Sequence, residues 1–108
     1  MDRRAMLKKL KRFKDEITRK YNVERVILFG SYARGKIDVH SDADIIVVGN
    51  FKKKGNLNRA PLFYREWHLV HKIDLPVDFI CYTPEEFERL KNQVSIVSEA
   101  LKEGIEIK

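Results

Sequence analysis

The stretch VILFGSYARGKIDVHSDADIIVV, residues 26–48, decides the fold that we expect for this chain of 108 residues. It opens with Val26–Phe29, a short run rich in β-branched residues, which predicts a buried strand that Gly30 ends. It closes with Asp42–Val48, which predicts a central strand because nothing charged follows its first three residues. Two strands joined through a Gly-Ser turn therefore form the centre of the expected fold.

Helices and further strands are expected on either side of this stretch. Apolar residues at three- and four-residue intervals predict an amphipathic first helix over residues 3–21. The other expected elements are a one-turn helix at 32–34 with Ser31 as N-cap and Gly35 at its end, a helix with Pro61 at its first position running to about Ile73, a strand at 77–82, a helix opened by Thr83 and Pro84 and running to about Asn92, a helix at 94–103 and a terminal strand at 105–107. Alternating strands and helices predict an α/β (α+β) domain in the order α-β-α-β-α-β-α with a possible closing strand, its sheet covered on at least one face.

Length and composition limit the class of protein. Residues 1–108 suffice for one domain and leave no room for a separate substrate-binding module, so a partner is expected to supply any large substrate. No apolar run approaches the ~20 residues of a membrane span, and the N-terminus is charged rather than signal-like. Cys81 is the only cysteine, which excludes an intramolecular disulfide and a cysteine-based zinc site and favours a reducing, cytoplasmic compartment.

The net charge of +6 comes from the N-terminal segment. Residues 1–25 hold ten Lys and Arg against four Asp and Glu, whereas the rest of the chain holds twelve of each. Such a basic helix could attract nucleic acid or an acidic protein surface, although a solvated helix face is the commoner explanation. We therefore treat this segment as a docking surface for an unknown partner.

Paired carboxylates are the most informative feature for chemistry. Asp42 and Asp44 lie two residues apart on the expected strand, so both side chains project from one face, about 7 Å apart along the backbone. Two like charges at the start of an apolar strand cost free energy unless a cation lies between them or their pKa values rise. Magnesium meets this need, because it takes oxygen ligands and commonly binds one or two carboxylates together with substrate phosphates.

Two further features fit a nucleotide site. Gly30 and Ser31 lie at a strand-to-helix turn, where a glycine lets a phosphate approach the backbone and the serine adds a hydroxyl donor. A third carboxylate would complete a two-metal site. Asp78 is the best candidate, because it lies on the third strand and faces away from its apolar neighbours, whereas Asp74 belongs to the preceding loop.

At this point the sequence resembles a known family. Residues 30–35, a gap of five residues and then residues 41–45 resemble the signature of the polymerase-β-like nucleotidyltransferase superfamily, in its minimal single-domain form. The resemblance covers nearly the whole chain and implies a small mixed sheet flanked by helices. It also implies that two magnesium ions bind to the acids, and that the nucleotide's phosphates are held in the Gly-Ser turn. The residues carried over are Asp42, Asp44 and Asp78 for catalysis and metal, and Gly30, Ser31 and Arg34 for the nucleotide. Arg34 has two other interpretations, facing the sheet or pairing with Asp38.

The same resemblance implies an activity and a partner. Members like this chain transfer a nucleoside monophosphate, AMP from ATP as the family-level expectation, to an acceptor hydroxyl. They are typically the antitoxin half of a two-component system and adenylylate a tyrosine of a small, all-helical HEPN-domain toxin. A homo-oligomer or a heteromeric complex is compatible with so small a domain.

Two interpretations from other classes stay open. One is a binding module without catalysis that masks a partner protein, and the other is nucleic-acid binding through residues 3–25. The remaining conspicuous side chains favour structural roles. Those are Trp67 and Cys81 in the core, His68 and His71 on a helix without a third metal ligand, and Lys52–Lys54 in a solvated loop over residues 49–58. His40, beside the acidic pair, could touch substrate, although a loop histidine without a role is the commoner case.

Overall fold

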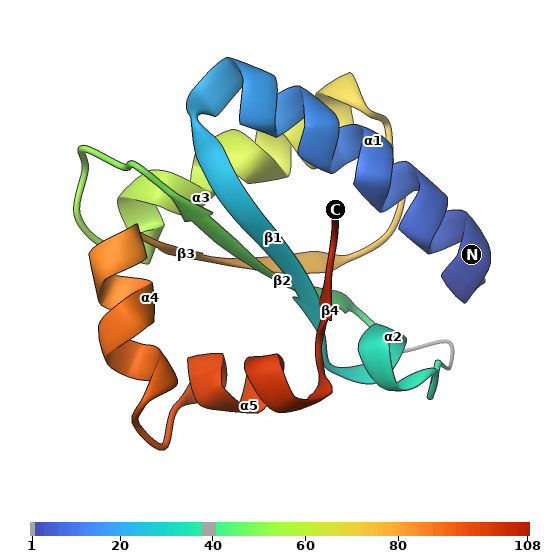
Figure 1. The fold of residues 1–108 in the computed structure, drawn as a ribbon. Helices are drawn as coiled ribbons and strands as arrows, with labels where there is room; N and C mark the ends of the chain where they lie inside the picture. The colour runs from blue at the N-terminus through green and yellow to red at the C-terminus, as the bar shows by residue number, and fades with distance from the viewer. Residues whose placement is uncertain (1, 38–40) are drawn as a thin grey trace.

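Four strands form one mixed sheet in the order β3-β2-β1-β4 (Figure 1). The structure is a computed structural model and describes residues 2–37 and 41–108. The central strand β2 runs antiparallel to β1 and parallel to β3, and β4 pairs antiparallel with the other edge of β1. The elements in chain order are α1 (Arg3–Tyr21), β1 (Val23–Phe29), α2 (Ser31–Arg34), β2 (Ala43–Gly49), α3 (Asn56–Arg65), the π-helix η1 (Glu66–Val70), β3 (Val77–Tyr82), α4 (Pro84–Lys91), α5 (Ile96–Glu103) and β4 (Ile105–Glu106).

Helices cover both faces of the sheet. Figure 1 shows α1 and α3 on one side of the strands and α4 and α5 on the other. The larger apolar core lies under α1, α3 and η1, and a smaller core lies under α4 and α5. Successive residues of β2 point alternately into the two cores, as Ile45 does into the larger and Ile46 into the smaller. The expected α/β architecture, with a small mixed sheet flanked by helices, is confirmed.

Three local predictions are confirmed closely. The first helix spans Arg3–Tyr21, with Asp2 as its N-cap. The third strand spans Val77–Tyr82 and buries alternate residues. Thr83 caps the following helix in a capping box, in which Glu86 returns a hydrogen bond to the Thr83 backbone N–H.

The helix expected around Pro61 is present, but its start and the form of its end differ from the prediction. It begins at Asn56 after Gly55, so Pro61 lies inside the helix rather than at its first position. The missing N–H of Pro61 would have bonded to the carbonyl of Leu57, in the exposed first turn, and this makes the loss tolerable. The end of the predicted helix is a π-helix, Glu66–Val70, followed by a turn at His71. Trp67 within it is fully buried and donates from Nε1 to the carbonyl of Leu75, as a core residue should.

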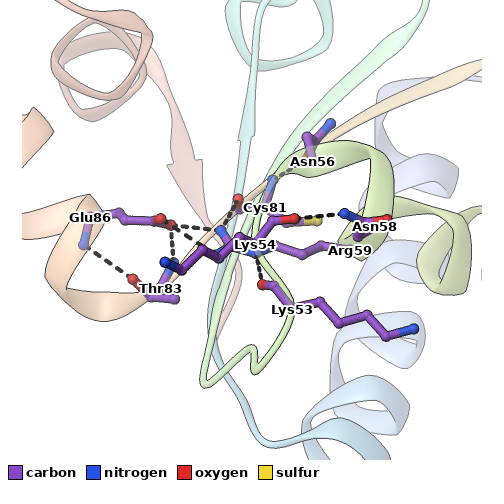
Figure 2. A network of polar contacts seen from close by, with 8 residues as sticks. All are labelled: Lys53, Lys54, Asn56, Asn58, Arg59, Cys81, Thr83 and Glu86. Atoms are coloured by element: carbon purple, nitrogen blue, oxygen red, sulfur yellow. Dashed lines mark hydrogen bonds and ion pairs between the residues drawn. The ribbon is translucent and has the colours of Figure 1, made fainter.

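Side chains from α3 close the outer edge of β3. The side-chain amide of Asn56 donates to the Phe79 carbonyl at 2.8 Å and accepts from the Cys81 N–H at 2.7 Å, as a neighbouring strand would. The Tyr64 hydroxyl accepts from the Phe79 N–H, and the buried Arg59 donates to the Cys81 carbonyl. Figure 2 shows Arg59 reaching from α3 to the Cys81 carbonyl and to Glu86 of α4. These contacts fix β3, the strand that carries Asp78, against α3 and α4.

The helices formed within residues 2–37 and 41–108 include none that combines the length and apolar character of a membrane span.

Candidate active site

The acidic residues expected to act together lie on neighbouring strands. Asp44 on β2 and Asp78 on β3 are register partners in the parallel pair, so their side chains project from the same face of the sheet. Asp42 immediately precedes β2 and lies two residues from Asp44, which places it on the same face. Both outer acids, Asp42 and Asp78, are exposed, whereas Asp44 is half-buried between them. Residues 34 positions apart in sequence are therefore brought side by side.

The electrostatics of the three acids are coupled. Burial raises the pKa of Asp44 above its ordinary range, and the negative charges of Asp78 and Asp42 raise it further. The Arg34 guanidinium opposes this rise. Asp44 thus sits in a field of like charge that its surroundings do not cancel.

Gly30 lies against the Asp44 carboxylate. The last residue of β1, Phe29, is paired with Asp44, so the turn that follows passes directly beside it. Gly30 has φ +74° and ψ −151°, a backbone conformation that residues other than glycine rarely adopt. A Cβ at this position would overlap Asp44 Oδ2 and lie 3.2 Å from Asp44 Cγ. Glycine is required here both for the backbone conformation and for the close approach.

The turn continues as α2, a single helical turn. Its N-cap is Gly30 and not Ser31 as predicted, and Ser31 is instead the first helical residue. The positive φ of Gly30 turns the chain into the helix one residue earlier than expected, and glycine has no side chain that could cap the helix. Gly35 ends the helix in the left-handed conformation, as predicted.

Arg34, the third residue expected at the nucleotide, is held at the side of the site. Its Nη1 lies 3.3 Å from Glu103 Oε2 of α5, with both side chains largely exposed. Its charge still reaches Asp44, because it lowers the pKa of that carboxyl. This exposed pairing differs from the interpretation in which Arg34 faces the sheet, whereas the interpretation in which it pairs with Asp38 stays a prediction. The proposed partner Asp38 and the substrate-contact candidate His40 lie outside the described residues.

The donor chemistry of the three acids fits a hard divalent cation. Carboxylate oxygens are the ligands that magnesium prefers. Burial is the largest cause of the raised pKa of Asp44, and the charges of Asp78 and Asp42 add to it; a cation would neutralise those charges. In the described part of the chain, no three His, Cys, Asp or Glu side chains are already arranged as metal ligands. This holds for Asp42, Asp44 and Asp78 and also for the two histidines. His68 Nδ1 lies 3.1 Å from the Ile73 carbonyl, and His71 Nε2 lies 3.9 Å from Glu66 Oε2.

Comparison with known proteins identifies the family. Residues 10–107 match the nucleotidyltransferase domain family, and the chain therefore belongs to that family of enzymes. Two proteins of Methanocaldococcus jannaschii, both named putative protein adenylyltransferase, are similar to it. One is 49% identical over 41 residues, 36% of this chain and 41% of the relative. The other is 44% identical over 45 residues, 40% of this chain and 45% of the relative. The chain thus matches less than half the length of these relatives.

A solved structure shows the same fold over most of the chain. The crystal structure of a putative nucleotidyltransferase from Sulfolobus solfataricus superposes with a TM-score of 0.56 at 30% identity. The superposition covers 85% of this chain and 79% of the other. The polymerase-β-like architecture inferred from the sequence signature is consistent with this similarity.

Sequence reasoning missed Arg3. Its guanidinium donates to the carbonyls of Tyr32 and Ala33 in α2, although 29 and 30 residues separate the partners. No local pattern marks such a contact, because Arg3 is one of ten basic residues in the first 25. Charge at the C-terminal end of a helix is a general preference, but the sequence does not say which arginine supplies it.

Proposed function

We propose that this chain transfers a nucleoside monophosphate, AMP from ATP, to the hydroxyl of an acceptor protein. One observation carries the proposal: Asp44 and Asp78 are register partners on adjacent strands, and the Gly30 backbone lies directly against the Asp44 carboxylate. These contacts support our proposal that the carboxylates bind a metal ion and that the neighbouring turn contacts a triphosphate. The relatives named as protein adenylyltransferases support a protein as the acceptor.

Each residue has a distinct task in this proposal. Asp42 and Asp44 would bind the metal ion that accompanies the nucleotide, and Gly30 and Ser31 contact the phosphates of the nucleotide. Asp78 is exposed, so a hydroxyl of the acceptor can reach it and pass its proton to this carboxylate. Magnesium, when bound to these carboxylates, would neutralise phosphate charge and make the hydroxyl more acidic.

The reaction balances without any further reagent. A bond forms between the acceptor oxygen and the α-phosphorus, the bond from that phosphorus to the β-phosphate oxygen breaks, and pyrophosphate leaves. The hydroxyl proton passes to the Asp78 carboxylate and then to water. Positioning and charge neutralisation supply most of the rate gain in such phosphoryl transfers.

The acceptor proposed here is a tyrosine hydroxyl of a small, all-helical HEPN-domain protein, and the chain acts as its antitoxin. This rests on the resemblance to minimal nucleotidyltransferases, and the exposed basic residues of α1 provide a surface on which a partner can dock. If the chain were only a mask, it would neutralise the partner equally well after Asp42→Asn and Asp44→Asn. If it acted by binding nucleic acid, that binding would be steeply salt-dependent and unchanged by the same substitutions.

The test is transfer of label from α-labelled ATP to the partner protein, followed by mass spectrometry of the adduct. Asp44→Ala and Asp78→Asn should lower labelling by at least about a hundredfold, as expected for groups that act on the reacting atoms. Asp74→Asn is the matched control, because Asp74 is an exposed acid four residues before Asp78 and lies outside β3. Equal labelling by wild type and Asp44→Ala would refute the proposal.

A further inference from the structure

The first turn of α1 is tied to the segment that carries the proposed phosphate contacts. Arg3 Nε donates to the Tyr32 carbonyl at 2.9 Å, and Arg3 Nη2 donates to the Ala33 carbonyl at 3.0 Å. Figure 1 shows the start of α1 and α2 on the same side of the molecule. One planar guanidinium thus holds two consecutive carbonyls, a geometry that favours a single orientation.

This contact matters because α2 has little stability of its own. It is a single turn of four residues, Ser31–Arg34, and a helix this short gains almost nothing from cooperativity. Its own backbone supplies two bonds, from the Arg34 N–H to the Gly30 carbonyl at 3.1 Å and from the Gly35 N–H to the Ser31 carbonyl. The Lys36 N–H adds a bond to the Ser31 carbonyl just beyond it. The position of α2 therefore depends on contacts from elsewhere in the chain.

Those contacts come from three directions. Tyr32 is buried in the larger core, and its burial raises the pKa of its phenol, with a smaller contribution from the charge of Asp42. Arg34 is paired with Glu103 of α5, but both of these side chains are largely exposed, so this pair is weak. Of these three side chains, only Arg3 forms hydrogen bonds to the backbone carbonyls of α2.

Arg3 is itself held in position by the helix cap. Asp2 accepts a hydrogen bond from the Ala5 N–H at 2.8 Å, and its carbonyl accepts from the Met6 N–H. Met6, in the same turn, is fully buried. The first turn of α1 is thus fixed to the core, and Arg3 extends from a rigid base.

We propose that Arg3 is a positioning residue for nucleotide binding: it fixes α2 so that Ser31 and the Gly30 backbone are presented to the triphosphate beside Asp44. This inference rests on the proposed function. The chain's own α1 then contributes to the nucleotide site without touching the nucleotide.

The experiment compares Arg3→Ala, Arg3→Lys and the control Arg4→Ala. Arg4 is exposed in the same turn, and its side chain makes no hydrogen bond or ion pair with the described residues. The probe is the non-cleavable ATP analogue with an α,β-methylene bridge. It is titrated into the protein in the presence of magnesium, and binding is measured by calorimetry. We expect Arg3→Ala to raise the Kd of the analogue about tenfold and Arg4→Ala to leave it unchanged. Arg3→Lys should raise the Kd less than Arg3→Ala, because a lysine keeps the positive charge but lacks the planar fork of the guanidinium. Guanidinium chloride at millimolar concentration, below the range that unfolds proteins, should restore part of the affinity of Arg3→Ala alone.

Amide hydrogen exchange of the ligand-free protein tests the structural half independently. The amides of Arg34 and Lys36 should exchange about tenfold faster in Arg3→Ala, while amides of β2 stay protected. Unchanged exchange would overturn the anchoring of α2, and faster exchange with an unchanged Kd would overturn its importance for the nucleotide. If wild type bound no nucleotide, the proposed function would fail, and with it the nucleotide role of Arg3.

Discussion

Replacing Gly30 by alanine should damage both the stability of the protein and the arrangement of the acidic cluster. Gly30 adopts φ +74° with an extended ψ, and holding alanine there costs about 1–3 kcal/mol. The added Cβ would also overlap Asp44 Oδ2, and relieving such an overlap typically costs about 1–3 kcal/mol more. Both costs fall on a protein whose whole stability is of the order of 5–15 kcal/mol.

The chain offers a matched control for the backbone part of this cost. Gly55 has φ +82° and ψ 147°, a similar positive-φ, extended conformation, but a Cβ there would meet no atom within 4 Å. Gly55→Ala should therefore cost only the backbone strain. The excess cost of Gly30→Ala over Gly55→Ala then measures the approach of the turn to Asp44.

A double-mutant cycle with Asp44→Ala isolates that approach. In this background the nearest remaining atom to the new side chain is the Cβ of residue 44, at 3.5 Å, an ordinary contact distance. Gly30→Ala should then cost about as much as Gly55→Ala, which gives a coupling energy of about 1–3 kcal/mol. Urea unfolding can be followed by the fluorescence of Trp67, the single and fully buried tryptophan. An equal cost of Gly30→Ala with and without the Asp44 side chain would refute the geometry of the site.

Three further predictions follow from individual contacts. Hydrogen bonds from Arg59 hold the pKa of Glu86 below its ordinary value of 4.5. This pair should therefore stabilise the fold fully above about pH 4.5, and the stabilisation should be lost as the pH falls through the lowered pKa of Glu86 in the folded protein. In Glu86→Gln, the urea midpoint should decline less steeply as the pH is lowered. Burial raises the pKa of the Cys81 thiol to about 12, so this thiol should resist a disulfide reagent at pH 8 until urea unfolds the protein, and rapid labelling of the native protein would contradict its burial. Magnesium should raise the Tm of wild type but have much less effect on Asp44→Asn, because Asp44 is the acid most crowded by like charge; an equal shift in both proteins would argue against a metal at these carboxylates.

The parts of the fold that were predictable are those with a local cause. Alternation of apolar residues identified Val77–Tyr82 and the outward face of Asp78, because the side-chain period of a strand is fixed. The sequence Thr83-Pro84-Glu85-Glu86 identified a helix start, because the capping box is formed by residues three apart. The pairing of Asp44 with Asp78 needed one further assumption, that the strands lie next to each other in register, and the structure meets it.

The parts that were not predictable depend on partners distant in sequence. Residues 49–58 look like a solvated loop, yet Asn56 begins α3 and binds the edge of β3 more than 20 residues away. The preference of Pro61 for the first turn of a helix was overridden, because the exposed first turn tolerates the lost hydrogen bond. Arg3 likewise depends on where α1 and α2 meet in space, which no pattern within either segment states.

The charge distribution supplies a further argument that the acidic cluster is a binding site and not a structural feature. Where this chain uses acids to hold its fold, it pairs them: Glu86 with Arg59 and Glu106 with Arg25, each with a lowered pKa. Asp44 shows the opposite, a raised pKa, in a protein with a net charge of +6 and ample cations. The cation that acts on it, Arg34, is itself paired with Glu103. Asp44 therefore lacks the kind of ion-pair partner that Glu86 and Glu106 have, as our proposal that an external cation binds at these carboxylates requires.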